Sequence, residues 1–197
     1  MSWISGNRYL TESEMQNNAL IIRDYLVDKG WSMNAIAGML GNMESESTIN
    51  PGIWQGLIEG TGGGGGFGLV QFTPYTNFTN WADSNGYEWA DGNAQLKWID
   101  EVTSSFGQWI PTDNYNFSFE TFKTSSESPE YLASSFLKNF ERAGVEVEEE
   151  RRTQGRKWYE FINTGSIVIE KPIGDYARFN KRKGFNFLLF NKRRKVR

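Results

Sequence analysis

The chain has 197 residues, of which 38% are hydrophobic and 15% aromatic, enough for the core of one domain with an appendage. It contains no cysteine and no histidine, which excludes disulfides, thiolate or histidine metal sites, and catalysis by Ser-His or Cys-His pairs. A general acid or base must therefore be Glu, Asp, Lys or Tyr, and we expect neither a metal nor a cofactor. The net charge of −3 conceals an asymmetry: nine Lys/Arg and no acid lie from Arg178 to Arg197, which leaves −12 on the first 177 residues.

Two helices are predicted in the first quarter of the chain. A capping box over Thr11–Glu14 begins the first, and apolar residues then recur at helical spacing until Gly30. The second is expected to begin at Ser32 and to end near Thr48, with an apolar stripe along one face.

A turn-rich region with five consecutive glycines follows from Gly52 to Pro74 and closes on FGLVQF, a short strand or the start of a helix. Three further helices are predicted: Asn93 to Phe106, Ser128 to Gly144 and about Val147 to Ile162. Gly155 is expected to be a weak point in the last of these. We therefore expect a helix-dominated α+β fold with a small β or irregular region.

The stretch from Gly165 to Gly174 is predicted to be a linker. It divides the chain into a folded domain, residues 1–164, and a linker with a basic C-terminal tail, residues 165–197. The start of the chain lacks the basic segment followed by an apolar segment that is typical of a signal peptide. No stretch approaches eighteen consecutive apolar residues. We expect neither a signal peptide nor a transmembrane segment.

Two glutamates, Glu44 and Glu46, lie at the end of the second predicted helix. At about 100° per residue, Glu46 lies about 20° from Met39 and extends the apolar stripe, whereas Glu44 is expected to face water. A carboxyl group that faces an apolar interior or cleft has a raised pKa and can protonate a glycosidic oxygen. The alternatives are a capping or ion-paired role for Glu46 and a solvated one for Glu44.

The pattern E-S-x-x-N-P, starting at Glu46, followed by G-L-V-Q at residues 68–71, resembles goose-type lysozymes and bacterial lytic transglycosylases. AIAGMLGNMESESTINPGIWQ, FGLVQFTP and SFLKNFERAG resemble the phage tail lysozyme family over roughly Tyr9 to Ile162. This resemblance implies a lysozyme-like fold with Glu46 as the catalytic acid. It also implies cleavage of the bond between N-acetylmuramic acid and N-acetylglucosamine in peptidoglycan, by a protein of the phage tail tip acting at the host cell wall.

A second carboxylate would complete a lysozyme mechanism, and Glu59 is the local candidate, with a solvated loop residue as its alternative. In lytic transglycosylases the sugar's own 6-hydroxyl attacks instead, so the sequence leaves the product open. Four residues are candidates for binding the substrate: Ser47, Gln71, Trp54 and Tyr75. Gln71 is expected to hydrogen-bond Glu46 or an N-acetyl group, and the aromatic pair either stacks on sugars or packs in the core.

Glu141 and Arg142, in NFERAG, are interpreted as an internal ion pair that holds the last helices to the cleft, with a direct contact to sugar as the alternative. The basic tail, with its apolar FNFLLF, is a solvated appendage, an anchor to another virion tail protein, or a binder of anionic wall polymers or lipid. The expected partners are peptidoglycan glycan strands and other tail proteins. Nucleic acid is not expected, because the acidic body would repel phosphate. The competing function is a catalytically inactive structural tail-tip or wall-binding protein with the same fold.

Overall fold

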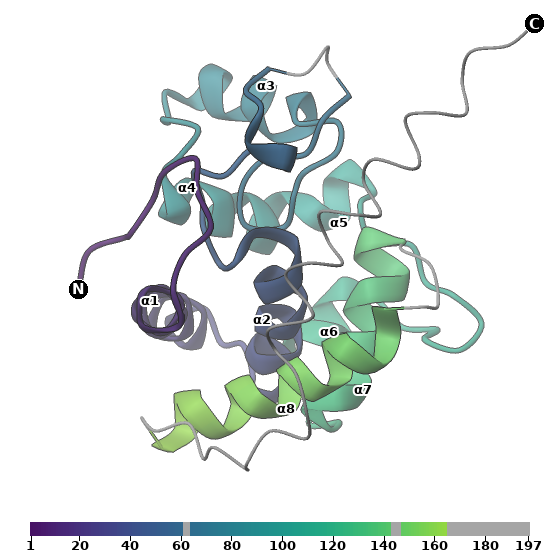
Figure 1. Ribbon diagram of the computed structural model, residues 1–197. Coiled ribbons are helices and arrows are strands. Elements are labelled where there is room, and N and C mark those ends of the chain that lie inside the picture. Colours follow the sequence, from purple (N-terminus) through teal and green to yellow (C-terminus); the bar gives the residue numbers. More distant parts are fainter. Residues whose placement is uncertain (61–63, 143–146, 165–197) are drawn as a thin grey trace, which may run out of the picture. The chain divides into compact units, whose positions relative to one another are not determined.

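The computed structural model describes residues 1–60, 64–142 and 147–164, and it is dominated by helices (Figure 1). The helices are α1 (Glu12–Asp28), α2 (Met33–Ser47), α3 (Thr76–Asn85), α4 (Gly92–Lys97), α5 (Thr103–Phe106), α6 (Phe119–Thr124), α7 (Pro129–Phe136) and α8 (Glu148–Thr164). Three single turns complete them: the 3-10 turn η1 (Gln55–Leu57) and the π-helical turns η2 (Trp98–Val102) and η3 (Leu137–Glu141).

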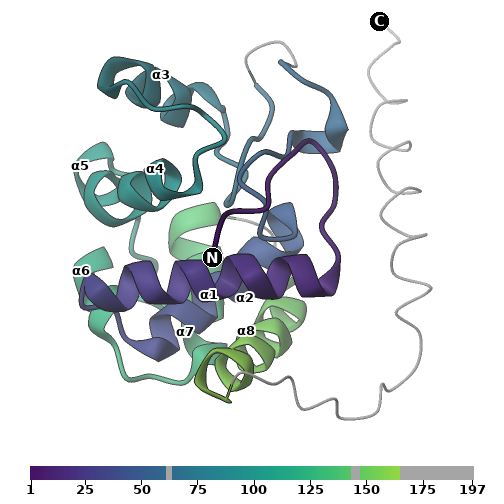
Figure 2. The same ribbon diagram turned by 90° about the vertical axis from the view of Figure 1, so that its left-hand side faces the viewer.

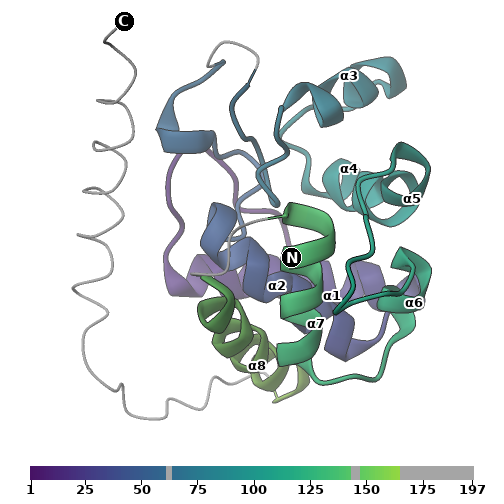
Figure 3. The same ribbon diagram turned by 90° about the vertical axis from the view of Figure 1, so that its right-hand side faces the viewer.

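Helix α2 is enclosed by other helices. Views from opposite sides place α1 in front of it in Figure 2, and α7 and α8 in front of it in Figure 3. Glycines permit the close approach, because a Cβ on Gly38 would lie 2.8 Å from the backbone nitrogen of Ala133 in α7. A Cβ on Gly41 would lie 2.6 Å from the backbone nitrogen of Gly155 in α8. Gly155 is thus a packing contact within a continuous helix rather than the weak point expected.

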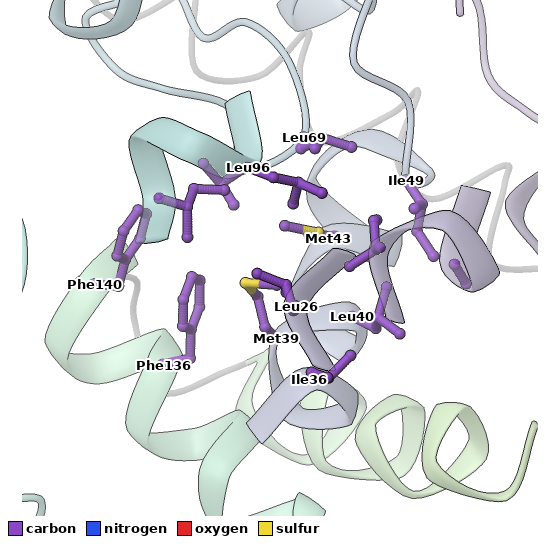
Figure 4. Close-up of a cluster of buried hydrophobic side chains, with 14 of the residues drawn as sticks. Leu26, Ile36, Met39, Leu40, Met43, Ile49, Leu69, Leu96, Phe136 and Phe140 are labelled. Atoms are coloured by element: carbon purple, nitrogen blue, oxygen red, sulfur yellow. The ribbon is translucent and has the colours of Figure 1, made fainter. Parts of the chain in front are cut away.

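The hydrophobic core surrounds α2 and joins the helices to the loop that follows it (Figure 4). The side chains labelled there are all buried, and they come from α1, α2, α7, η3, α4 and the loops after α2: Leu26, Ile36, Met39, Leu40, Met43, Ile49, Leu69, Leu96, Phe136 and Phe140. Large aliphatic and aromatic side chains buried in this way contribute about 1.5–3 kcal/mol each relative to exposure. This core fixes the end of α2 against the loop that contains Leu69.

The predicted β part is not confirmed. Among the described residues there is no strand, and the pairing in this region is limited to isolated bridges of Phe67 with Trp54 and with Phe72. The Phe72 backbone N–H donates to the Phe67 carbonyl at 2.9 Å, so FGLVQF forms a tight turn. Gly68, with a φ of +77°, lies within this turn, which is too short to form a strand ladder.

Most predicted helices are present, including the cap at Ser128 followed by Pro129 at the start of α7. The helix predicted from Asn93 to Phe106 is a continuous run of α4, η2 and α5. Helices α3 and α6 were not predicted. The expected stop at Gly144 and the whole segment 165–197 lie outside the described residues, and none of the described helices is long and apolar enough to cross a membrane.

Candidate functional site

The candidate site lies at the C-terminal end of α2, which hydrogen bonds hold in place. The Ser47 hydroxyl is fully buried and donates to the Leu69 carbonyl at 2.7 Å. The Asn50 side-chain amide donates to the carbonyls of Gly6 and Arg8 at 2.7 and 2.6 Å. The E-S-x-x-N-P motif therefore connects the helix end to the following loop and to the N-terminal segment. Ser47 positions the site from within the protein, and its burial corrects the prediction that it contacts sugar.

Glu46 is the candidate acid, and its side chain is 26% exposed. Its Oε1 accepts a hydrogen bond from Nη2 of Arg151 at 2.5 Å, and the Arg151 side chain is only 6% exposed. Arg151 comes from the first turns of α8, and its Nη1 also lies 3.9 Å from the Glu150 carboxylate. A buried guanidinium therefore holds one oxygen of Glu46 while part of the side chain remains accessible to solvent.

A second carboxyl group, that of Glu141 in η3, lies beside Glu46. Both of its oxygens are buried, and neither has a well-aligned hydrogen-bond partner among the described residues. Burial raises the pKa of Glu141 well above its ordinary value, and the nearby negative charge of Glu46 raises it further. The positive charge of Arg151 opposes these effects only in part. Burial and the charge of Glu46 thus both favour the protonated form of Glu141, next to the candidate acid.

The expected ion pair between Glu141 and Arg142 is not formed. Arg142 has a φ of +58° and directs its guanidinium outward, where Nη1 donates to the Gln108 carbonyl at 2.8 Å. No ion pair between these two neighbours occurs in the described part of the chain. The Glu141 side chain instead joins Glu46 and Arg151.

The prediction that Glu44 faces water is wrong. Its carboxylate accepts hydrogen bonds from Lys157 Nζ at 2.9 Å and from Trp158 Nε1 at 2.7 Å, and its side chain is only 12% exposed. Burial raises the pKa of Glu44, and the charge of Lys157 opposes that rise. The helical-phase argument failed because it assumed one apolar face, whereas α8 covers the side of α2 that carries Glu44.

Gln71 supports the loop next to the site. Its Nε2 donates to the carbonyls of Ile53 and Gly68 at 3.3 and 3.2 Å. None of its hydrogen bonds to described residues reaches Glu46, contrary to one of the two expectations for it. Its backbone adopts a φ of +46°, which is strained for a residue other than glycine. The hydrogen bonds hold this residue in the turn that packs against the end of α2.

The candidate sugar-stacking residues form an aromatic cluster. Trp54 is 9% exposed and packs edge-on against Tyr75, with ring centroids 5.0 Å apart. Phe67 and Trp89 complete the cluster, at 4.7 and 6.4 Å from Trp54. Trp54 therefore packs in the core, which was the alternative to stacking on a sugar. Tyr75 is only partly buried.

Glu59, the candidate second carboxylate, is exposed in a turn after η1. None of the ion pairs or side-chain hydrogen bonds within the described ranges includes it. Among the described residues, it is the carboxyl group of Glu141 that interacts with Glu46. One residue, Gly60, separates Glu59 from residues 61–63, which are outside the described part.

Sequence reasoning missed Arg151 because it lies in the charged run EEERR. A signal was nevertheless present in the spacing of α8, whose buried residues recur on one face: Arg151, Gly155, Trp158, Phe161 and Ile162. An arginine in line with an apolar stripe faces the core, where it needs a carboxylate partner. The described ranges contain no group of three acidic side chains suited to a metal ion.

An open cavity of about 480 Å³ lies away from these residues. It is lined by α1, α8 and the start of α2: Arg23, Asp24, Val27, Asp28, Met33, Ile162 and Asn163. Its lining includes none of the candidate catalytic or sugar-binding residues, so it is not part of the site at Glu46.

Comparison with known proteins identifies the family of the chain and a relative. The sequence model of a family described as phage tail lysozyme matches residues 17–162, which include Glu46, Glu141 and Arg151. The chain is 47% identical over 173 residues to Morphogenesis protein 1 of Bacillus phage B103. That alignment covers 86% of this chain and 47% of the relative, so the chain spans about half the length of the curated relative it matches.

Proposed function

The chain belongs to the phage tail lysozyme family, and from this premise we propose that it cleaves the glycan strands of peptidoglycan. The bond cut is that between N-acetylmuramic acid and N-acetylglucosamine, and Glu46 is the general acid. The setting proposed is the phage tail tip during penetration of the host cell wall. No cofactor takes part in this reaction.

The placement of Glu46 at the end of α2 carries the proposal. Of the two glutamates in this helix end, Glu44 is held by Lys157 and Trp158. Glu46 is more exposed, at 26% against 12%, and a substrate can approach it. Its carboxyl group is fixed by a buried arginine and lies beside a second, buried carboxyl group. Fixed orientation and a nearby proton are what a general acid requires.

The reaction begins when Glu46 gives its proton to the glycosidic oxygen, so that the C–O bond breaks through an oxocarbenium-like transition state. The sugar cation is then captured by water or by its own 6-hydroxyl group. We propose Glu59 as the carboxylate that activates the water in the first route. Tyr75 is proposed to stack on a sugar ring. Gln71 is proposed to shape the loop that leads to Tyr75.

Mass spectrometry of muropeptides released from purified wall tests the function. New glycan ends, reducing or 1,6-anhydro, support the proposal, and the mass of the end distinguishes the two routes. Products cut only in the peptide, or no products from a folded protein, would contradict it.

A structural role without turnover is the second candidate, and the name of the phage B103 relative, Morphogenesis protein 1, favours it. Such a protein would bind wall without releasing fragments. Its binding would be the same for the wild type and for Glu46→Gln. The digest that tests cleavage therefore also decides between the two functions.

The partners proposed are peptidoglycan strands and other virion tail proteins, the latter through the basic tail at residues 165–197. This tail lies outside the described residues, so its role rests on its charge and its FNFLLF sequence.

A further inference from the structure

We propose that Glu141 is the proton donor to Glu46: it holds in the resting protein the proton that Glu46 passes to the sugar, and Arg151 changes partner as that proton moves. This inference rests on the proposed function and adds a positioning residue to it. Three groups from three elements take part, Glu46 at the end of α2, Glu141 at the end of η3 and Arg151 in α8.

The resting contacts of Glu46 pose a difficulty for a general acid. Its Oε1 forms an ion pair and a hydrogen bond with the guanidinium of Arg151. An ionised carboxylate has no proton to donate to a glycosidic oxygen. The proton must therefore reach Glu46 from a neighbouring group or from solvent at the time of reaction.

Glu141 has the properties of that neighbouring group. Both its oxygens are buried without a well-aligned hydrogen-bond partner among the described residues, and an ionised carboxylate left so would be costly. Burial and the charge of Glu46 raise the pKa of Glu141, and this direction agrees with a protonated resting form. The second charged group near Arg151, Glu150, accepts a hydrogen bond from Ser45 at 2.6 Å and adds further negative charge.

Arg151 has a donor available for the exchange. Its Nε is buried and has no hydrogen-bond partner in the described part of the chain, whereas Nη2 donates a hydrogen bond to Glu46. A guanidinium presents five N–H donors in a rigid fork and can therefore serve two carboxylates in turn. Its charge already acts on Glu141. A small shift of the guanidinium would stabilise Glu141 once it is ionised.

The transfer conserves protons and charge. The O–H bond of Glu141 breaks, an O–H bond forms on Glu46, and the negative charge passes from Glu46 to Glu141 beside the same guanidinium. Glu46 then protonates the glycosidic oxygen. The site regains one proton from the attacking water or 6-hydroxyl group, and the resting arrangement returns. A sugar seated over Glu46 favours the transfer, because desolvation favours the neutral form of a carboxyl group.

Infrared difference spectroscopy tests the resting state without any activity assay. The wild type at neutral pH is expected to show the carbonyl stretch of a buried protonated carboxyl group. Glu141→Gln should remove this band, Glu46→Gln should retain it, and the control Glu149→Gln, at a side chain that is 88% exposed, should leave it unchanged. A band that persists unchanged in a folded Glu141→Gln variant would overturn the inference.

A second measurement requires no change at Glu141. In Glu46→Gln the band should disappear at a lower pH than in the wild type, because the charge that raises the pKa of Glu141 is gone. An unchanged midpoint would show that the two groups are not coupled and would contradict the proposal. This result does not depend on whether the protein cuts glycan.

The pH profile of glycan cleavage separates proton donation from a merely structural role. Glu141→Gln should lose roughly 10-fold or more in rate at neutral pH and recover toward wild type as the pH falls, since solvent then protonates Glu46. A structural defect would lower the rate equally at all pH values, and that outcome would contradict the inference. An inactive wild type, or an active Glu46→Gln, would instead contradict the proposed function, and the infrared result would still stand.

Discussion

Gly41 of α2 and Gly155 of α8 meet backbone to backbone, so that a Cβ on Gly41 would lie 2.6 Å from the nitrogen of Gly155. The same hypothetical Cβ would lie 2.7 Å from the carbonyl oxygen of Arg151. The contact therefore sets the distance at which α8 presents Arg151 to Glu46. A pair of glycines that are not among the reacting groups thus sets the separation of the two helices that carry Glu46 and Arg151.

Gly41→Ala tests this relationship. We expect a loss of about 1–3 kcal/mol in the free energy of unfolding, because the obstructing atoms belong to the backbone and α8 must shift. The rate of glycan cleavage should fall by more than the loss of folded protein accounts for, because Arg151 moves with α8. Urea unfolding and the digest measure the two effects. The matched control is Gly64→Ala, whose Cβ would meet no atom within 4 Å. Equal stability of both variants would contradict the packing argument.

Glu46→Gln should fold and lose about 10²–10⁴ in cleavage rate, because an amide cannot donate the proton. Glu44→Gln keeps a group that can accept from Lys157 and Trp158, so we expect it to retain most activity with some loss of stability. Muropeptide release normalised to folded protein is the measurement. An inactive Glu44→Gln beside an active Glu46→Gln would reverse the assignment.

The sequence predicted α1, α2 and α7 well because capping residues and helical spacing are local signals. It failed for Glu44, since no local pattern shows that α8 covers the side of α2 that carries this residue. FGLVQF has the composition of a strand, yet its turn at Gly68 leaves no partner for a ladder.

The group formed by Glu46, Glu141 and Arg151 could be predicted only in part. The motif identified Glu46, whereas the other two are more than 90 residues further along the chain and meet it through packing alone. Arg142, beside Glu141, appeared to be the natural partner because adjacent charges suggest an ion pair. The left-handed backbone at Arg142 directs the two side chains apart.

Glu59→Gln distinguishes the two routes of glycan cleavage. If Glu59 activates water, the variant should lose about as much rate as Glu46→Gln and form few reducing ends. A rate within about twofold of wild type, with 1,6-anhydro ends in both digests, would instead show that the sugar's 6-hydroxyl attacks and Glu59 is not required.

Truncation after residue 164 tests the division of the chain. Helix α8 ends at Thr164, and within the described residues it packs on α2 and α7. We expect the shortened chain to unfold at the same temperature and to cut soluble glycan at the same rate. Its binding to whole walls or tail particles should weaken, most of all at low salt, because screening acts over about 8 Å at physiological ionic strength. Unfolding on truncation would show that the tail belongs to the domain.

The last prediction concerns stability against pH. The pKa of Glu141 is raised in the folded protein, so between the ordinary carboxyl value of 4.5 and that raised value the folded state binds more protons than the unfolded state. The free energy of unfolding therefore falls as the pH rises through this window. Glu141→Gln removes this dependence, because an amide has the same charge at every pH.

We therefore expect wild type and Glu141→Gln to have similar stability near pH 4, and the variant to become progressively more stable relative to wild type toward neutral pH. A pKa that differs by one between the folded and unfolded states corresponds to about 1.4 kcal/mol in the free energy of unfolding. Urea unfolding at a series of pH values measures the difference. The surface substitution Glu149→Gln, in α8, should leave the slope unchanged, because an ion pair made by a side chain that is 88% exposed contributes little to stability. A difference between wild type and Glu141→Gln that is constant with pH would mean that Glu141 is ionised in the folded protein, and the proton on which the site depends would have to come from elsewhere.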